Sequence, residues 1–432
     1  MRIGLGLSLG TAREIAGALR FVLMLDFKNG IYSSRGVSGG FSDVVTFNRA
    51  STGTYWAQDG TLQTTAADEP RFEYDPVTGE AMGLLVEGAS ANALLRSTDV
   101  SNAVWAGTLD FTPSPVTSVI AGQTAQRMAN NGTVAARTII QTVGSFDGGW
   151  RTVSVIWEAD TATSFLLTLW DVTAGSHVYA VTFDTAAMTA TPFAGTGLHK
   201  LTDLGIGPNG GRLVRAEVSG VGTTGNTARY SLYVTNNSLN TNAAIVHHTQ
   251  SEALIGATSP IVTGASAVTR AADDAVFAGD VTAMGLDGPA TVVAFGRNPR
   301  AFAADGAALM VGIGPFAERI TIGARDFDLD GAYNPYYQHL VGTESDASGI
   351  LPQTINPASV RLALAWDTTA ISGAQDGAIV WTATKTATRI NPIDRIDIGA
   401  LAGGARKWGG TIERIVVYPT RLTDAQLQGI TS

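Results

Sequence analysis

The chain has 432 residues, a length that allows two or three domains. Its net charge of −9 argues against nucleic acid or an anionic membrane surface as a partner, because phosphate contacts need clustered basic residues. Without cysteine, the chain can form no disulfide, no cysteine-ligated zinc site and no thiol nucleophile.

Residues 1–40 are predicted to form an N-terminal attachment segment. The first part is apolar and rich in glycine, and Thr11 and Glu14 have the spacing of a capping box. Such a tail can dock on a partner subunit, or it can be an ordinary first strand of the chain's own sheet. Phe21–Phe27 is apolar on both faces, which predicts a central strand. No stretch approaches the ~20 apolar residues of a membrane span, so we expect no membrane insertion.

Residues 41–97 are predicted to supply short strands that pack on the larger domains. Arg71–Tyr74 alternates polar and aromatic residues, as a half-buried strand does. The next five residues, Asp75–Gly79, have turn chemistry, because proline presets φ and glycine accepts a left-handed conformation. Gly83–Gly88 then indicates the second strand of a hairpin.

Strands separated by glycine-rich turns continue from about residue 98 to 268. Several alternate in polarity, which predicts one buried and one wet face. The clearest are residues 136–143, 151–157, 164–170, 177–183, 212–218 and 229–234. Regular strands without helical patterns between them are typical of an antiparallel sandwich or jelly roll.

Residues 269–432 repeat this pattern. Strands are expected at residues 290–295, 308–313, 319–323, 360–366, 377–381, 395–398 and 411–418. Thr423–Gln426 has the capping-box spacing that opens a short final helix. The sequence thus predicts an all-β chain with two antiparallel β-sandwich domains, at 98–268 and 269–432, behind the N-terminal attachment segment.

Three carboxylates lie at alternate positions before a glycine. Asp326, Asp328 and Asp330 match the first half of a calcium loop, because alternate spacing aims oxygen ligands one way. The glutamate that completes such a loop is absent, since Tyr337 occupies its position. The other interpretation is a solvated acidic strand edge. No cofactor other than this calcium ion is expected.

An aromatic cluster follows immediately. Aromatic faces beside amides and carboxylates suit sugar rings, because the ring gives an apolar platform and the polar groups take hydroxyls. A loop packed on a neighbouring subunit is the alternative. Most tryptophans lie in or beside strands and are expected in the core, whereas Trp56 is the better candidate for exposure. The candidate glycan-binding residues are Tyr333, Asn334, Tyr336, Tyr337 and Trp56.

The residues of ordinary catalytic sites are sparse. If His247 and His248 lie on one strand, their rings point to opposite faces, which suits one metal ion poorly. The sequence has no nucleophile elbow, no zinc-protease motif and no phosphate loop. Glycoside hydrolysis needs two nearby acids, for which Asp326, Asp328, Glu73 and Glu87 are formal candidates. We expect no catalytic residues.

Several motifs resemble segments of phage tail-fibre and particle-surface proteins. They are Phe47–Tyr55, Pro70–Ser97 and Ala267–Asp273, the last of which closes a lectin-like sandwich in such proteins. There, the place of residues 98–268 holds a carbohydrate-binding-module-like jelly roll. Gly410–Pro419 and Arg421–Leu427 are similar to the end of concanavalin-A-like (laminin-G-like) domains. The resemblance therefore implies a concanavalin-A-like domain at 269–432.

The resemblance implies a non-enzymatic structural virion protein, such as a tail-fibre, tail-tip or spike subunit. It would be assembled in the host cytoplasm, displayed on the virion surface, and would mediate host adsorption by binding cell-surface polysaccharide. The N-terminal segment would contact other virion subunits. A homo-oligomer is expected, by default a trimer, although a pentamer or hexamer is equally consistent with the residues.

Two alternatives stay open. A capsid decoration or head-spike scaffold subunit without a glycan role would have large apolar subunit interfaces over its aromatic loops. A glycan-cleaving enzyme would have a deep cleft with two facing carboxylates, at least one with a raised pKa.

Overall fold

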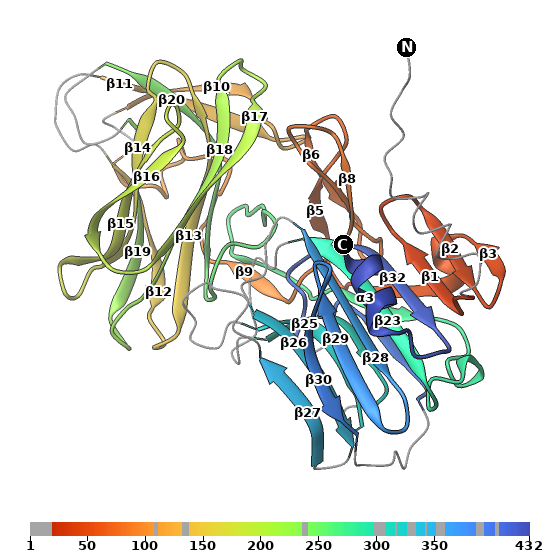
Figure 1. The fold of residues 1–432 in the computed structure, drawn as a ribbon. Helices are drawn as coiled ribbons and strands as arrows, with labels where there is room; N and C mark the ends of the chain where they lie inside the picture. Colours follow the sequence, from red (N-terminus) through yellow and green to blue (C-terminus); the bar gives the residue numbers. More distant parts are fainter. Residues whose placement is uncertain are drawn as a thin grey trace. The chain divides into compact units, whose positions relative to one another are not determined.

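The computed structural model (Figure 1) is almost entirely β, which confirms the predicted fold class. It describes residues 20–107, 111–131, 138–235, 241–297, 307–315, 318–325, 334–341, 344–350, 359–385, 393–401 and 406–432. The chain is divided into two compact units. Unit 1 contains the chain up to Asn48, Met82–Val86 and the chain from Asp273 onward; unit 2 contains Arg49–Ala81 and Glu87–Ala272.

Unit 2 is built on two antiparallel sheets. The six-stranded sheet has the order β10 (Phe111–Thr117), β11 (Thr124–Asn130), β20 (Ala243–Glu252), β13 (Trp150–Ala159), β18 (Arg212–Val221) and β17 (Leu198–Ile206). The five-stranded sheet has the order β12 (Ile139–Ser145), β19 (Thr227–Tyr233), β14 (Ser164–Asp171), β15 (Ser176–Asp184) and β16 (Thr189–Gly195). The six strands predicted in this region are all present.

The core of unit 2 fills the space between these sheets. Trp157 of β13 stacks on Phe165 of β14 with ring centroids 4.7 Å apart, and Phe165 stacks on Phe183 of β15 at 5.3 Å. All three side chains are buried. Alternate residues of β13 and β14 therefore face inward, and the residues between them face away from the core.

Shorter strands complete unit 2. They are β5 (Gly53–Trp56) paired with β6 (Leu62–Thr65), β9 (Ser90–Asn92) paired with β21 (Val268–Arg270), and β7 (Phe72–Tyr74). The predicted reversal after β7 is present, since the Asp75 carboxylate accepts from the backbone N–H groups of Val77 and Thr78.

Unit 1 is also built on two sheets. The larger has the path β3 (Val37–Gly39), β2 (Ile31–Ser34), β1 (Leu23–Asp26), β32 (Gly410–Tyr418), β23 (Ala290–Arg297), β28 (Val360–Trp366), β29 (Ala370–Gln375) and β30 (Ala378–Thr384), with β8 (Ala81–Val86) also on β32. The seven-stranded sheet has the order β27 (Glu344–Ile350), β26 (Asn334–Val341), β25 (Ile320–Arg325), β24 (Ala307–Ile313), β31 (Ile396–Ile398), β22 (Asp274–Phe277) and β4 (Val45–Asn48).

The predicted central strand at Phe21–Phe27 is confirmed, because β1 lies between β2 and β32. Helix α3 (Asp424–Thr431) begins with the expected capping box of Thr423 and Gln426. The other helical turns in the described part of the chain are α2 (Phe41–Val44) and η2 (Thr282–Met284). None of the helices in the described residues is long and apolar enough to cross a membrane. Residues 1–19 of the predicted attachment segment lie outside the described residues.

Gly83 in β8 is fixed by close backbone contact. Its φ is +100°, and a Cβ at this position would lie 2.1 Å from the carbonyl oxygen of Ile412 in β32. We expect Gly83→Ala to lower the free energy of unfolding of unit 1 by about 2–3 kcal/mol, because it adds both backbone strain and overlap. Chemical denaturation measures this loss. Gly30→Ala is the matched control, since Gly30 also has positive φ but open space around it; equal effects of both variants would contradict the role of the overlap.

Candidate functional site

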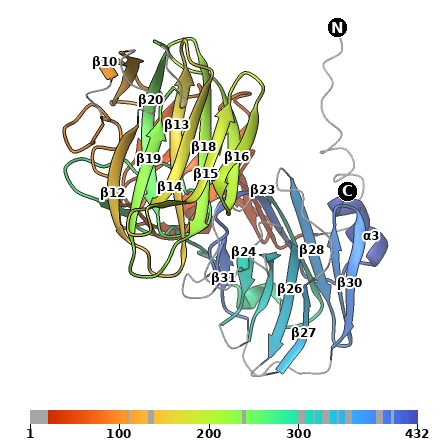
Figure 2. The same ribbon diagram turned by 90° about the vertical axis from the view of Figure 1, so that its left-hand side faces the viewer.

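The outward face of the five-stranded sheet in unit 2 presents a row of aromatic and cationic side chains. Figure 2 shows β12, β19, β14, β15 and β16 side by side in this sheet. On β14, Trp170 is opposite His177 of β15 on one side and Arg229 of β19 on the other. Arg229 is in turn opposite Thr142 of β12. The row therefore crosses four neighbouring strands in register.

Phe193 of β16 extends the row to the fifth strand. It is the extra residue of a bulge, because Ala180 is opposite Ala194 and Val181 is opposite Pro192. Bulges redirect side chains out of the regular alternation. The Phe193 ring lies 5.8 Å from the His177 ring. With neighbouring strands about 4.8 Å apart, the four steps from β16 to β12 span about 19 Å. We call Phe193, His177, Trp170, Arg229 and Thr142 the binding row.

The rings of the binding row contact one another edge to face. His177 lies 4.5 Å from Trp170 with an interplanar angle of 85°, and it meets Phe193 at 84°. The guanidinium carbon of Arg229 lies 5.0 Å from the Trp170 ring centroid, a cation–π contact. These contacts hold four side chains in fixed positions, so little conformational entropy remains to be lost when a ligand binds.

Hydrogen bonds from the same face support the row. The Thr168 hydroxyl lies 2.8 Å from Nδ1 of His177, and Nε of Arg229 donates to the Ser231 hydroxyl at 3.2 Å. Thr168 and Ser231 are opposite each other on β14 and β19. The sheet thus orients both the imidazole and the guanidinium.

Phe193 is the most accessible ring of the row, with 57% of its side chain exposed. Trp170, His177 and Arg229 are half-buried, and Thr142 is exposed. Burial, together with the charge of Arg229, lowers the pKa of His177 below its usual value. Neutral imidazole keeps one donor and one acceptor nitrogen. The row therefore offers an apolar ring face, a hydrogen-bonding imidazole and a cation on one surface.

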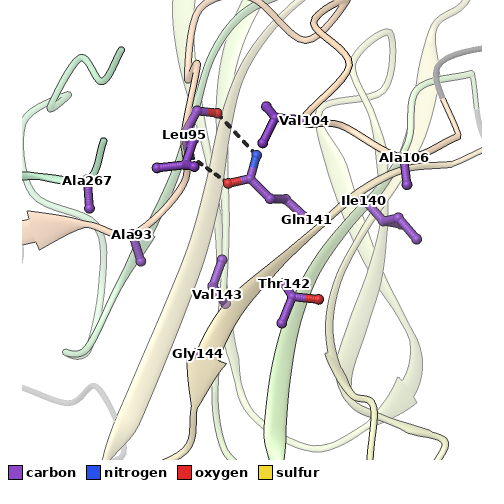
Figure 3. Close-up of a pocket in the computed structure, with 10 residues that line it drawn as sticks. All are labelled: Ala93, Leu95, Val104, Ala106, Ile140, Gln141, Thr142, Val143, Gly144 and Ala267. Atoms are coloured by element: carbon purple, nitrogen blue, oxygen red, sulfur yellow. Dashed lines mark hydrogen bonds between the residues drawn. The ribbon is translucent and has the colours of Figure 1, made fainter. Parts of the chain in front are cut away.

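A hollow of about 520 Å³ lies beside β12 at the end of the binding row (Figure 3). Its lining includes Ile140, Gln141 and Thr142 of β12, together with Leu95 and Val104. Figure 3 shows the Gln141 amide joined to Leu95, whose N–H donates to Oε1 at 2.6 Å and whose carbonyl accepts from Nε2 at 3.1 Å. Thr142 belongs to both the row and the hollow, so the two form one continuous surface.

A second hollow in unit 2, of about 780 Å³, is more polar. Its lining includes Arg96, Asp99, Gln123 and Gln126. Its lining contains one carboxylate, that of Asp99, whereas the lining of the first hollow contains none. Neither has the two facing acids that a glycan-cleaving enzyme of the ordinary kind would need.

The aromatic residues predicted as sugar platforms have other roles where the structure describes them. Trp56 is buried in a cluster with Leu62, Ile120 and Ile156, so its predicted exposure was wrong. The outward face of the six-stranded sheet carries apolar residues here, and Trp56 covers them.

Tyr336 and Tyr337 of β26 are also buried. Tyr337 donates its hydroxyl to the carbonyl of Ala374 at 2.6 Å and stacks on Trp381 at 6.0 Å, so its ring faces are core contacts. Both tyrosines belong to a strand and not to the open loop that the sugar-platform interpretation requires. Asn334 begins β26. Tyr333, Asp326, Asp328 and Asp330 lie outside the described residues, and the calcium site stays a prediction.

The formal catalytic carboxylates Glu73 and Glu87 are buried in unit 2. Glu73 accepts from the backbone N–H of Trp56, and Glu87 forms an ion pair with Arg71 at 2.9 Å. The predicted alternation of residues 71–74 is therefore reversed: the charged side chains are inside and Phe72 and Tyr74 are half-buried. Burial is possible because each charge has a partner.

The two neighbouring histidines of β20 bind different groups. His247 contacts Glu158 at 2.9 Å, whereas His248 contacts the carbonyl of Ile261 at 3.1 Å. Within the described residues, no group of three metal-ligating side chains is arranged to hold an ion.

The sequence interpretation missed Trp170, His177, Arg229 and Phe193. A signal was available for Trp170: in β14, Phe165, Leu167 and Leu169 are fully buried, so Trp170 falls on the opposite face. No local signal placed Arg229 or Phe193 beside it, because these contacts depend on strand order and on a bulge.

Comparisons with known proteins identify no family. No family model and no curated protein sequence matches this chain. Solved structures with similarity include the CBM40 of Ruminococcus gnavus IT-sialidase bound to α2,3-sialyllactose, with 17% identity over 35% of this chain and 91% of that one, at a TM-score of 0.29.

Two further solved structures are similar at the same low level. Domain 4 of AbnA, an extracellular arabinanase from Geobacillus stearothermophilus in complex with arabinotriose, has 14% identity over 41% of this chain and 82% of that one, at 0.29. The LG1-3 region of the laminin α2 chain has 11% identity over 68% of this chain and 66% of that one, at 0.24. With TM-scores this low, these similarities carry no argument about function.

Proposed function

We propose that this protein is a non-catalytic glycan-binding protein whose ligand lies along the binding row of unit 2. The observation that carries the proposal is the register of His177, Trp170 and Arg229 across neighbouring strands, with the Phe193 ring 5.8 Å from the His177 ring. Alternating apolar rings and polar groups on one open face match a sugar chain, which presents C–H faces and hydroxyl edges in turn.

The row would bind its ligand in defined ways. The exposed ring of Phe193 receives the apolar face of one sugar residue. The imidazole of His177 and the hydroxyl of Thr142 exchange hydrogen bonds with sugar hydroxyls. A shallow face of this kind binds weakly one copy at a time, and several linked copies reach high avidity.

The setting we propose is adsorption to a cell surface. The motifs at Phe47–Tyr55 and Pro70–Ser97 resemble phage particle-surface proteins, and that resemblance alone supports placing the protein on a virion. A particle that displays many copies would turn weak single sites into firm attachment to host polysaccharide. Imaging intact particles with this subunit labelled would test the setting independently of glycan binding.

Phe193→Ala tests the glycan-binding proposal. We expect this variant to bind polysaccharide up to about tenfold more weakly, because an aromatic contact is worth roughly 0.5–1.5 kcal/mol. A glycan array identifies a ligand, and titration calorimetry measures the loss. Folding should be unchanged, since the ring is largely solvent-exposed.

Ile206→Ala is the control for this experiment, because Ile206 is also an exposed apolar residue of unit 2 but belongs to the other sheet. Equal losses in both variants, or wild-type binding by Phe193→Ala, would argue against the binding row. An array without any bound polysaccharide would favour a scaffold role.

A further inference from the structure

Arg229 is a cation without an acidic partner. Other arginines of unit 2 form ion pairs, such as Arg71 with Glu87, Arg127 with Asp160 and Arg212 with Asp203. Within the described residues, no carboxylate forms an ion pair with Arg229, although the chain as a whole carries a net charge of −9. Among the described residues, the binding row thus carries one unpaired positive charge, that of Arg229, on a protein whose net charge is negative.

The guanidinium of Arg229 is held in place with its outer donors unused. Its Nε donates to Ser231, and its Cζ lies 5.0 Å from the Trp170 ring centroid. In the part of the chain that the structure describes, the two terminal nitrogens have no hydrogen-bond partner, and neither is a buried unsatisfied atom. They are therefore open to solvent as a pair of donors. A fixed guanidinium with two free terminal nitrogens matches a carboxylate in a bidentate arrangement.

The groups around Arg229 do not compete for it. Asp171 follows Trp170 on β14, but its carboxylate accepts from the Asn226 amide at 2.8 Å and from the backbone N–H of Ala174 at 2.9 Å. Tyr233 and His177 are the ionisable neighbours that interact electrostatically with Arg229. Neither side chain is a carboxylate. An anion that approaches the row thus meets an uncompensated positive charge.

We propose that the ligand of the binding row is a carboxylate-bearing glycan and that Arg229 binds its carboxylate. The inference rests on the proposed glycan-binding function and names its ligand class. Phe193 would hold one sugar ring of the glycan. Arg229, three strands away, would bind the acidic sugar of the same glycan. Acidity thus becomes the feature that separates the ligand from neutral polysaccharides.

The test compares acidic polysaccharides with their neutral reduction products. Polygalacturonate carries uronic acid carboxylates and polysialic acid carries those of nonulosonic acids; carboxyl reduction turns each into a neutral polymer of the same linkage. We expect the wild-type protein to bind at least one acidic polymer about tenfold or more tightly than its reduced form, as for a hydrogen bond to a charged group. This preference should weaken as salt is added.

Arg229→Gln should remove the preference while leaving binding to the reduced polymer unchanged. Arg229→Lys should retain part of it, because lysine keeps the charge and loses the planar fork. Arg96→Gln is the control, since Arg96 is an exposed arginine of unit 2 that lies outside the binding row. Thermal unfolding of each variant reports whether the sheet is intact; if Arg229→Gln unfolds, Arg229→Lys and the salt series carry the test.

Four outcomes would overturn the inference. Equal binding of acidic and reduced polymers would do so while leaving glycan binding standing. If the protein bound neutral glycans on the array but neither acidic polymer, the inference would also be overturned while glycan binding stood. Loss of the preference in Arg96→Gln but not in Arg229→Gln would place the anion elsewhere. Binding to no glycan at all would remove the proposed function together with the inference.

Discussion

Glu87→Ala is expected to lower the free energy of unfolding of unit 2 by about 3–5 kcal/mol. The Glu87 carboxylate is fully buried and accepts from Arg71 at 2.9 Å and from the N–H and hydroxyl of Ser259 at 2.8 and 2.6 Å. Arg270 lies 3.6 Å from the same carboxylate. Removal of Glu87 would leave two buried guanidinium groups without their common counter-charge.

Urea denaturation monitored on the unit 2 transition measures this loss. Glu87→Gln should cost less, because the amide oxygen still accepts a hydrogen bond although the charge is gone. Glu69→Ala is the control, since Glu69 is exposed and its carboxylate caps only its own local turn. An unchanged midpoint for Glu87→Ala would show that the two arginines reach water or other acceptors, and would contradict the buried network.

Unit 2 is expected to lose stability in mild acid through His248. Burial, with a smaller contribution from the charge of Arg215, lowers the pKa of His248 to about 3 from its ordinary value of 6.5. The folded state therefore keeps a neutral imidazole that the unfolded chain protonates below pH 6.5. This contribution to stability is complete above pH 6.5 and is lost as pH falls toward 3. At 1.36 kcal/mol for each pKa unit, the loss is about 2 kcal/mol at pH 5 and about 4 kcal/mol at pH 3.

Glu252, at the end of the same strand, acts in the opposite sense. Burial raises the pKa of its carboxyl group, so its protonated form contributes stability at low pH that is lost as pH rises. The comparison of wild type with His248→Gln isolates the histidine, because Glu252 is present in both. Denaturation series between pH 7 and pH 5 should show a steeper loss for wild type. Parallel pH profiles of the two proteins would contradict the assignment.

The strand content of the fold was predictable because apolar alternation is a local property. The runs at residues 151–157, 164–170 and 411–418 all form strands, and Thr423 caps the last helix as its spacing indicated. The partners of these strands were not predictable. β1 and β32 pair across nearly the whole chain, and no local pattern records such a contact.

The residues of the candidate site were not predictable from the local sequence. The sequence pointed to Tyr336, Tyr337 and Trp56 as sugar platforms, and the structure buries all three. The local sequence of a tyrosine-rich stretch does not show whether its rings are buried in a core or exposed to water. The binding row instead joins Phe193, Trp170 and Arg229 through strand order, so its residues are neighbours only after folding.

The reversed polarity of Arg71 and Glu73 has a similar cause. A single alternating strand shows which residues share a face, but not which face meets water. Here Arg71 donates to Glu87 and Ser259, and Glu73 accepts from the backbone N–H of Trp56. The identity of the inner face was decided by partners that lie up to 188 residues away along the chain.

The discontinuity of unit 1 has a consequence for biosynthesis. Its strand β32 lies between β1 and β23, so the larger sheet lacks an interior strand until Gly410–Tyr418 has left the ribosome. All segments of unit 2 emerge by Ala272 and can assemble while translation continues. In a nascent polypeptide halted before Gly410, unit 2 would therefore be folded and the larger sheet of unit 1 would be incomplete. The unpaired edges of its strands could then aggregate with those of other chains.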